Sequence, residues 1–429
     1  MKNAVLFKVL IAICLAIIAG WVTGTEAQLF GVPYVKFYGL IGQLFLNALM
    51  LVVVPLVTAS IITGTARMGS EHSFGALGAK TFGYYILTSF LAIVVGVTVF
   101  FLIGTGGSGN LGLMGATALK GSALEAAAQG DAFDKIAQVL MRVVPSNIIS
   151  AAAQGQILGL IGFCILFGIF LSKIEAQAAS VVLNFWKGIF QIMMKITHFV
   201  MKALPIGVFG LVAKVVATTG ADAFGSVAWF SVALIVGLLI FSLIVLPLML
   251  ALIAGVNPIL HFRAMAPALF TAFSTSSSAA SLPITIECVE QRAGVSNRIC
   301  SFTVPLGTSL SMSGTAMHQT VASLFIAQAY GLELTLPIIF TVMFMGLLMS
   351  IGVAGIPSAS LISVMIILPA IGVPVEGVGL IMAVERILDM CRTVVNVLGN
   401  TCCAVLVARS EGEKDVLVAH SLSNPKVTG

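Results

Sequence analysis

Apolar runs long enough to cross a lipid bilayer recur along this chain of 429 residues. Hydrophobic residues make up 59% of it and charged residues only 9%, against about 25% charged residues in a soluble domain. A membrane-spanning helix needs about 20 apolar residues, and the short alternating segments of an outer-membrane barrel are missing from the sequence. The sequence therefore predicts an all-α integral membrane protein. The apolar runs cover approximately residues 5–24, 37–65, 79–104, 156–172, 181–216 and 226–255.

The basic residues indicate how the chain is oriented. Short loops rich in Lys and Arg stay on the cytoplasmic side, so the net charge of +5 reflects orientation rather than nucleic-acid binding. We predict a multi-pass protein of the cytoplasmic (inner) membrane with both termini in the cytoplasm. Lys8 interrupts the run at 5–24, which favours a first membrane helix over a secretory signal. Alternate crossings would place on one side Lys2, Arg67, Lys80, Lys173, Arg263, Arg292, Arg298, Arg409 and Lys414.

Two further features concern the loops and the cysteines. The polar stretch at 105–150, which contains Asp131 and Asp134, predicts an outer loop with short helices. The seven cysteines lie mostly in apolar segments and lack the spacing of metal ligands. Small buried side chains are therefore expected, rather than disulfides or a zinc site.

In the second half of the chain, Gly, Pro and hydroxyl residues break the apolar segments. The breaks are "AFSTSSSAASLP" (Ala272–Pro283) and "GVAGIPSASLI" (Gly352–Ile362). Non-helical backbone at membrane depth persists only where protein or water satisfies its amides and carbonyls. The flanking apolar arms are too short for two full spans each. The pattern predicts two re-entrant hairpins, as at a transporter site in the bilayer midplane, rather than a flexible serine linker.

The last apolar segment carries a ladder of polar residues. Their spacings are 4, 3, 4 and 4, so at ~3.6 residues per turn all of them fall within about 80° of one helix face. Charged groups at such depth cost several kcal/mol, so they face the protein interior and usually mark a substrate or ion path. The ladder consists of Glu385, Asp389, Arg392, Asn396 and Asn400.

The two central charges of this ladder indicate the charge of a ligand. Arg392 offers a planar fork of donors to a carboxylate, and Asp389 offers a carboxylate to an ammonium group. A ligand that satisfies both, with its second carboxylate on the hairpin amides and serines, is an acidic amino acid. The alternative is a structural pair in which the two side chains, at i and i+3, neutralise each other.

Four motifs carry a resemblance to a known family. The segments "ERILDMCRTVVNVLGN", "STSSSAASLP", "GIPSASLI" and "SGTAM" resemble those of the glutamate transporter homologue family, the dicarboxylate/amino acid:cation symporters. The resemblance covers most of the chain. It implies eight transmembrane helices, two re-entrant hairpins and a homotrimer in which a transport domain moves like an elevator against a scaffold. The implied parts are scaffold at 1–78, transport domain at 79–108, scaffold and trimerisation domain at 109–220, transport domain at 221–410 and a cytoplasmic tail at 411–429.

The resemblance also implies the substrate contacts. Asp389 would take the amino group and Arg392 the side-chain carboxylate. Family members for C4-dicarboxylates lack this aspartate and those for neutral amino acids lack this arginine, so L-aspartate or L-glutamate is favoured. The arginine that the family places at the position of Ser276 or of Met390 is missing, which leaves Arg386 as a partial substitute. The implied substrate-binding residues are Ser276, Ser277, Ser278, Thr315, Gly355, Pro357, Asp389, Arg392, Thr393 and Asn396.

The family's sodium ligands are altered in this chain. Where the family reads Asn-Met-Asp-Gly-Thr, Ser311 and Ser313 replace the asparagine and the aspartate, and Asn400 stands where the family has a second aspartate. A buried sodium site without formal negative charge relies on carbonyl and hydroxyl dipoles alone, so its affinity should fall strongly. Three hydroxyl residues of the third apolar run still match the family, and a third sodium site consists mostly of backbone carbonyls. The degenerate sodium positions are Tyr85, Thr88, Ser89, Gly307, Thr308, Ser311, Met312, Ser313, Asn396 and Asn400.

A proton is one expected replacement for sodium. Glu385 and His318 are the proton-carrier candidates, because coupling needs a group that titrates near neutral pH in a dry site. His318 could instead be hydrogen-bonded in a packing face, and Glu385 could be paired with Arg386 or a lysine. We predict sodium-independent transport of acidic amino acids by proton symport or exchange. No cofactor is expected beyond a co-transported H⁺ or residual Na⁺. The alternative is sodium-coupled symport of acidic or neutral amino acids through the carbonyl site.

Other function classes fit the residues less well. Serines together with His318 and Asp389 suggest an intramembrane enzyme, yet no Gly-x-Ser-x-Gly elbow occurs and the acid lies beside an arginine. The chain is therefore predicted not to be an enzyme. An uncoupled anion channel or a sensor is a further alternative. The expected partners are the acidic amino acid, membrane lipid and identical subunits, and not nucleic acid.

Overall fold

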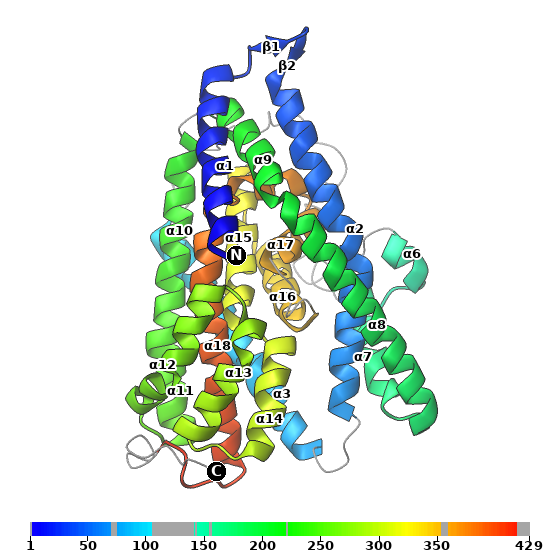
Figure 1. Ribbon diagram of the computed structural model, residues 1–429, viewed down its shortest axis with the longest axis vertical. Helices are drawn as coiled ribbons and strands as arrows, with labels where there is room; N and C mark the ends of the chain where they lie inside the picture. The colour runs from blue at the N-terminus through cyan, green and yellow to red at the C-terminus, as the bar shows by residue number, and fades with distance from the viewer. Residues whose placement is uncertain are drawn as a thin grey trace.

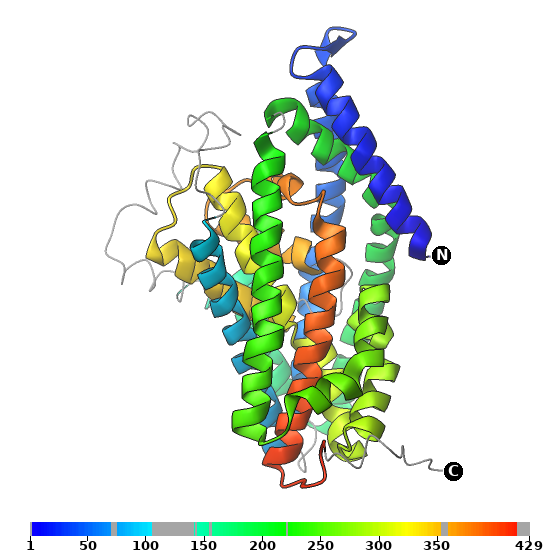
Figure 2. The ribbon, with the colours of Figure 1, turned by 90° about the vertical axis from the view of Figure 1, so that its left-hand side faces the viewer.

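The computed structural model describes residues 2–69, 75–104, 141, 144–153, 157–219, 222–352 and 359–417, which form an elongated bundle of helices (Figure 1 and Figure 2). Apart from turns and connections, these residues are helical, with one short antiparallel sheet of β1 (Gln28–Leu29) and β2 (Val32–Pro33). The predicted all-α membrane fold is confirmed. The outer-loop residues Asp131 and Asp134 and the hairpin residues Gly355 and Pro357 lie outside the described part.

The helical elements of the described residues follow one another from the N-terminal to the C-terminal end of the chain. They are α1 (Lys2–Thr23), α2 (Tyr34–Gly69), α3 (Gly75–Ile103), α6 (Ile148–Ala153), α7 (Ile157–Leu171), α8 (Ala176–Val200), η1 (Met201–Ala203), α9 (Leu204–Thr219), α10 (Asp222–Ile240), η2 (Phe241–Val245), α11 (Leu246–Met249), η3 (Leu250–Ala254), α12 (Pro258–Thr275), α13 (Ser278–Glu287), η4 (Cys288–Arg292), α14 (Asn297–Leu310), α15 (Ser313–Ala329), α16 (Leu336–Gly352), α17 (Ala359–Ala370), η5 (Val375–Leu380) and α18 (Glu385–Ser410).

Several of these helices are long and apolar enough to cross a membrane. Among the described residues, five stretches meet both conditions, and shorter apolar helices include α1, α7, α16 and α17. The chain is thus a multi-pass membrane protein, while the count of eight spans stays a prediction. The five stretches are Tyr34–Ala66, Leu77–Ile103, Ala176–Thr218, Gly225–Ala254 and Glu385–Ser410.

Two prolines change the geometry of the long helices. Proline lacks the N–H that would bond to the carbonyl four residues earlier, so the preceding turn must rearrange. Before Pro205 the chain passes through the 3₁₀ turn η1, which joins α8 to α9. Before Pro247 it passes through the π-helical turn η2, which extends α10 toward η3. The predicted apolar runs at 181–216 and 226–255 therefore each form a continuous helical segment, in which a short 3₁₀ or π-helical turn replaces α-helix before the proline.

The helices pack in two groups. The first group contains α1, α2, α7, α8 and α9, and the second contains α3, α10 and α12 to α18. Within the second group, every residue of α15 except Gln328 is buried, so other helices surround α15 on all sides. In Figure 1, α1 begins about midway along the vertical long axis, whereas α18 ends near the bottom of the bundle. The two groups meet where α9 and α2 approach α17, α16 and η5.

Small residues allow α2 and α9 to cross closely in the first group. A Cβ atom at Gly210 would lie 2.8 Å from the backbone nitrogen of Gly42 and 2.8 Å from the carbonyl oxygen of Tyr38. Gly210→Ala is therefore expected to lower the free energy of unfolding by about 1–3 kcal/mol through overpacking. Thermal unfolding of the purified protein in detergent measures the change.

Gly188 on α8 provides the matched control for this substitution. A Cβ atom there would meet nothing within 4 Å, so Gly188→Ala should leave stability unchanged or raise it by about 0.5–1 kcal/mol. Equal unfolding temperatures for the two variants would contradict a tight crossing of α2 and α9.

Breaks in the helices place non-helical backbone inside the second group. Between α12 and α13, Ser276 adopts the left-handed conformation at φ 47° and ψ 39°. Between α14 and α15, Ser311 is extended at φ −142° and ψ 118°, and Met312 is non-helical at φ −132° and ψ 79°. The hydroxyl-rich sequence predicts the first break, whereas the second was not predicted. Its only sequence signal is the polar "SMSGT" stretch within an apolar segment.

Candidate functional site

The polar face of α18 points into the second helix group, as its spacing predicts. The exposed fractions are only 6% for Glu385, 2% for Arg392, 3% for Asn396 and 3% for Asn400. The side chain of Asp389 is 14% exposed. Because buried charges are stable only when paired, the partners of these groups decide what the site can bind.

Arg392 lies at the centre of a network of charged groups. Its Nη2 donates to Asp389 Oδ1 at 2.7 Å, and its Nη1 donates to Glu385 Oε1 at 2.7 Å. Its Nη1 also lies 3.2 Å from His318 Nδ1. The two carboxylates stand one and two helical turns before the arginine, so one guanidinium fork reaches both. The anticipated pair of Asp389 and Arg392 is therefore present, with Glu385 as a second partner.

Glu385 is held differently from the sequence-based alternative of pairing with Arg386 or a lysine. Besides Arg392, it accepts a hydrogen bond from Ser360 Oγ on α17 at 2.9 Å. Its Oε2 lies 3.2 Å from His318 Nε2 on α15. Arg392 prevails over Arg386 because it lies on the buried face of α18, whereas the side chain of Arg386 is 28% exposed. Sequence reasoning missed Ser360, although it lies within the "IPSASLI" motif.

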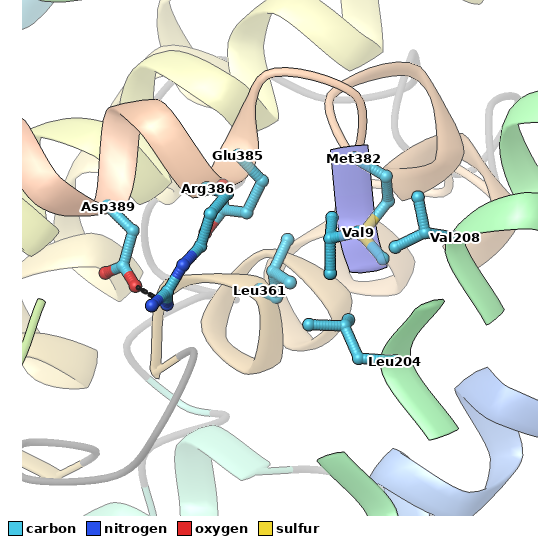
Figure 3. Close-up of a pocket in the computed structure, with 8 residues that line it drawn as sticks. All are labelled: Val9, Leu204, Val208, Leu361, Met382, Glu385, Arg386 and Asp389. Atoms are coloured by element: carbon cyan, nitrogen blue, oxygen red, sulfur yellow. Dashed lines mark hydrogen bonds and ion pairs between the residues drawn. The ribbon is translucent and has the colours of Figure 1, made fainter. Parts of the chain in front are cut away.

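A pocket adjoins this network, and the space within it, including open solvent, is about 320 Å³. Figure 3 shows Arg386 extending beside Glu385 toward Asp389, with apolar side chains opposite them. Arg386 Nη1 lies 3.4 Å from Asp389 Oδ2. The pocket lies between α1 and α9 of the first helix group and α17 and α18 of the second. Its lining residues are Val9, Leu204, Val208, Leu361, Met382, Glu385, Arg386 and Asp389.

The serines of the first hairpin lie at the N-terminus of α13. Ser277 caps this helix, because its Oγ accepts a hydrogen bond from the backbone N–H of Ala280 at 3.2 Å. Ser276 Oγ is buried without a hydrogen-bond partner among the described residues. Ser278 is buried at the first position of α13. Both α12 and α13 pack on α18, and the N-terminus of a helix such as α13 favours an anion because of the helix dipole.

Thr315 and Asn396 hold α15 against α18. The backbone N–H of Thr315 donates to Asn396 Oδ1 at 3.1 Å, and Asn396 Nδ2 donates to Thr315 Oγ1 at 3.0 Å. A Cβ atom at Gly314 would lie 2.6 Å from the carbonyl oxygen of Arg392, so glycine is needed for this approach. Thr393 Oγ1 donates to the carbonyl oxygen of Asp389 at 2.6 Å. These residues lie together, and their amide and hydroxyl groups already bond to one another.

The degenerate sodium positions also lie together, between α3, α14, α15 and α18. Ser89 Oγ is 3.3 Å from Ser311 Oγ. A Cβ atom at Gly307 would meet the hydroxyl of Tyr85 and would lie 2.9 Å from Asn400 Cγ. A Cβ atom at Gly399, beside Asn400, would be 3.4 Å from Ser313 Oγ.

Three hydroxyl groups at these positions donate to backbone carbonyls. Tyr85 donates to the carbonyl oxygen of Thr303 at 2.7 Å, Thr88 to that of Tyr85 at 3.1 Å and Thr308 to that of Val304 at 3.0 Å. Met312 is buried, and its Sδ lies 3.7 Å from Thr315 Oγ1. In sequence, α3, α14 and α15 contain no Asp or Glu. Within the described ranges, no cluster of three or more His, Cys, Asp or Glu side chains could hold a metal ion.

Comparison with known proteins shows which chains this one is similar to. Residues 5–410 match the family described as the sodium:dicarboxylate symporter family. The chain is 32% identical over 374 residues to the proton/glutamate-aspartate symporter of Escherichia coli (strain K12), covering 87% of this chain and 85% of that protein. It is 34% identical over 378 residues to the proton/sodium-glutamate symport protein of Bacillus subtilis (strain 168), covering 87% and 86%. It is 30% identical over 450 residues to human excitatory amino acid transporter 3, covering 93% and 84%.

Proposed function

The chain belongs to the sodium:dicarboxylate symporter family, and from that premise we propose that it is a secondary active transporter of L-aspartate and L-glutamate in the cytoplasmic membrane. We propose further that transport does not depend on sodium and uses a proton or an exchanged amino acid instead. The observation that carries the substrate assignment is the buried guanidinium of Arg392 between two carboxylates. The names of the relatives, which include glutamate and aspartate symporters, support it.

The charges of the site match those of an acidic amino acid. Arg392 can exchange its bonds to Glu385 and Asp389 for a bidentate bond to the substrate's side-chain carboxylate. Asp389, released from Arg392, can then accept the substrate ammonium group. The α-carboxylate would lie at the N-terminus of α13, on the amides beside Ser277 and Ser278, where the helix dipole favours negative charge. Thr315, Thr393 and Asn396 would complete the contacts.

The two helix groups support an elevator mechanism. We propose that the first group is the scaffold, at 1–78 and 109–220, and that the second is the transport domain, at 79–108 and 221–410. The pocket of Figure 3 lies on their boundary. Its scaffold side consists of Val9, Leu204 and Val208, so a moving transport domain would meet an apolar wall there. Exposed apolar side chains on α8, including Phe185 and Phe199, are available for lipid or for the other subunits of a homotrimer.

Sodium independence rests on the missing carboxylates. Buried Ser313 and Asn400 lie where the family has aspartates, and the nearby hydroxyls are bonded to protein carbonyls. A hard cation in this place would find dipoles but no formal negative charge. The alternative is that sodium binds to backbone carbonyls alone, and the experiment must distinguish this from transport without sodium.

Uptake by the purified protein in liposomes tests both parts of the proposal. Radiolabelled L-aspartate should accumulate when choline replaces sodium, driven by an inward proton gradient or by unlabelled aspartate inside. Asp389→Asn should abolish accumulation in every condition, because it removes the carboxylate expected to bind the ammonium group while keeping its shape. Asp415→Asn, at an exposed position after α18, is the control and should transport like the unaltered chain.

Each other outcome has a definite meaning. Strict dependence on external sodium would establish sodium-coupled symport and contradict the ion assignment. Anion current without substrate flux would indicate a channel. Absence of aspartate uptake in all conditions would overturn the transport of acidic amino acids.

A further inference from the structure

His318 lies entirely inside the protein and faces the charges of α18. Its side chain is 0% exposed. The charged groups that face it are Glu385, Arg392 and Asp389. From α10 its neighbour is the ring of Phe230, with a centroid distance of 6.1 Å. In the described parts of α3, α10, α16, α17 and η5, no charged or titratable group faces it.

The hydrogen positions around His318 follow from its contact with Arg392. A guanidinium group can only donate hydrogen bonds, so His318 Nδ1, 3.2 Å from Arg392 Nη1, must be the acceptor. The imidazole is then neutral and carries its proton on Nε2. This N–H lies 3.2 Å from Glu385 Oε2, although neither atom has an aligned hydrogen-bond partner among the described residues. A second proton cannot bind to Nδ1 while Arg392 donates to it, because two donors would face each other.

Arg392 is also the group that the proposed function assigns to the substrate's carboxylate. When the substrate carboxylate binds both guanidinium nitrogens of Arg392, His318 Nδ1 and Glu385 Oε1 lose their hydrogen bonds from Arg392 Nη1. Glu385 would then be a buried carboxylate beside a neutral imidazole, which costs several kcal/mol. A proton on Nδ1 converts the imidazole to an imidazolium and restores an ion pair with Glu385.

We infer that His318 Nδ1 is the coupling proton site, and that substrate and proton bind cooperatively because both require Arg392 to leave the pair of Glu385 and His318. This inference rests on the proposed function. The proton comes from solution and binds to the lone pair of Nδ1, which Arg392 no longer occupies. One proton also balances the charge. The two carboxylates and two guanidiniums of the cluster cancel, and the single net negative charge of the amino acid requires one positive charge.

Calorimetric titration of the purified chain with L-aspartate tests the inference without transport. Measured near pH 7 in buffers of different ionisation enthalpy, it should show about one proton taken up per aspartate bound, and the dissociation constant should rise about tenfold per pH unit above neutrality. His318→Gln should bind aspartate with no proton uptake and with an affinity that does not change with pH. Glu385→Gln, which removes the partner of the imidazolium, should also lose the uptake.

His261 provides the matched control. It is likewise 0% exposed and bonds to α18 through Thr401, at 3.1 Å, but it lies outside the charged cluster. His261→Gln should keep an uptake of one proton. Thermal unfolding of each variant in detergent confirms that it is folded.

The outcomes separate this inference from the proposed function. If the unaltered chain binds no aspartate, the proposed function fails. If it binds aspartate without taking up a proton, the substrate assignment stands and the inference is overturned. Full proton uptake by folded His318→Gln, or by folded Glu385→Gln when His318→Gln does not fold, would also overturn it.

Discussion

Replacing Arg392 by lysine is expected to weaken L-aspartate binding about 100-fold, although the charge is conserved. The guanidinium reaches Glu385 and Asp389 with separate nitrogens at 2.7 Å each, and the same two nitrogens would hold the substrate carboxylate. An ammonium group is a single point and cannot make both contacts. The loss of one charge-assisted hydrogen bond costs about 1.5–3 kcal/mol, which corresponds to about 10-fold to 150-fold in affinity. Calorimetric titration with L-aspartate measures the change directly.

Arg263→Lys is the control for this substitution. Arg263 is exposed on α12 and lies outside the charged cluster of α18. The Arg263→Lys variant should therefore bind aspartate with the affinity of the unaltered chain. If Arg392→Lys is folded and binds aspartate as tightly as Arg263→Lys does, the role assigned to Arg392 is wrong.

The arrangement along α18 could be predicted from the sequence because it depends only on helix geometry. Spacings of three and four residues place Glu385, Asp389, Arg392 and Asn396 on one face, whatever the rest of the fold does. The structure confirms that this face is buried. The break at Ser276 could be predicted for a similar reason, because a run of hydroxyl residues between apolar arms is incompatible with a lipid-facing helix.

The partners of these residues could not be predicted, because they come from distant parts of the chain. His318 is 74 residues from Arg392, and Ser360 is 25 residues from Glu385. Whether Arg386 or Arg392 pairs with Glu385 depends on which side of α18 is covered by α15 and α17. The non-helical backbone at Ser311 and Met312 likewise depends on tertiary packing. A histidine in an apolar segment is therefore read as a packing residue or as a proton site only once its neighbours are known.

Restoring the two family carboxylates is expected to make stability depend on sodium. In the double variant Ser313→Asp and Asn400→Asp, both new charges lie at positions that are 3% exposed. Without a cation, each uncompensated buried charge costs about 3–5 kcal/mol. The N-terminus of α15, where Ser313 lies, offsets at most about 2 kcal/mol of this cost. The variant should unfold at a much lower temperature in choline, and sodium at 100 times its dissociation constant should restore about 2.7 kcal/mol.

Ser313→Asn, with Asn400 left in place, is the matched control because it has the same side-chain shape without charge. It should unfold at the same temperature in sodium and in choline, as the unaltered chain should. Thermal unfolding in detergent at constant ionic strength separates the effect of sodium from the screening of surface charges. A sodium effect of equal size in the uncharged control would mean that carbonyl and hydroxyl dipoles alone bind the cation. The missing carboxylates would then not explain sodium independence, and the alternative of sodium-coupled symport would be favoured.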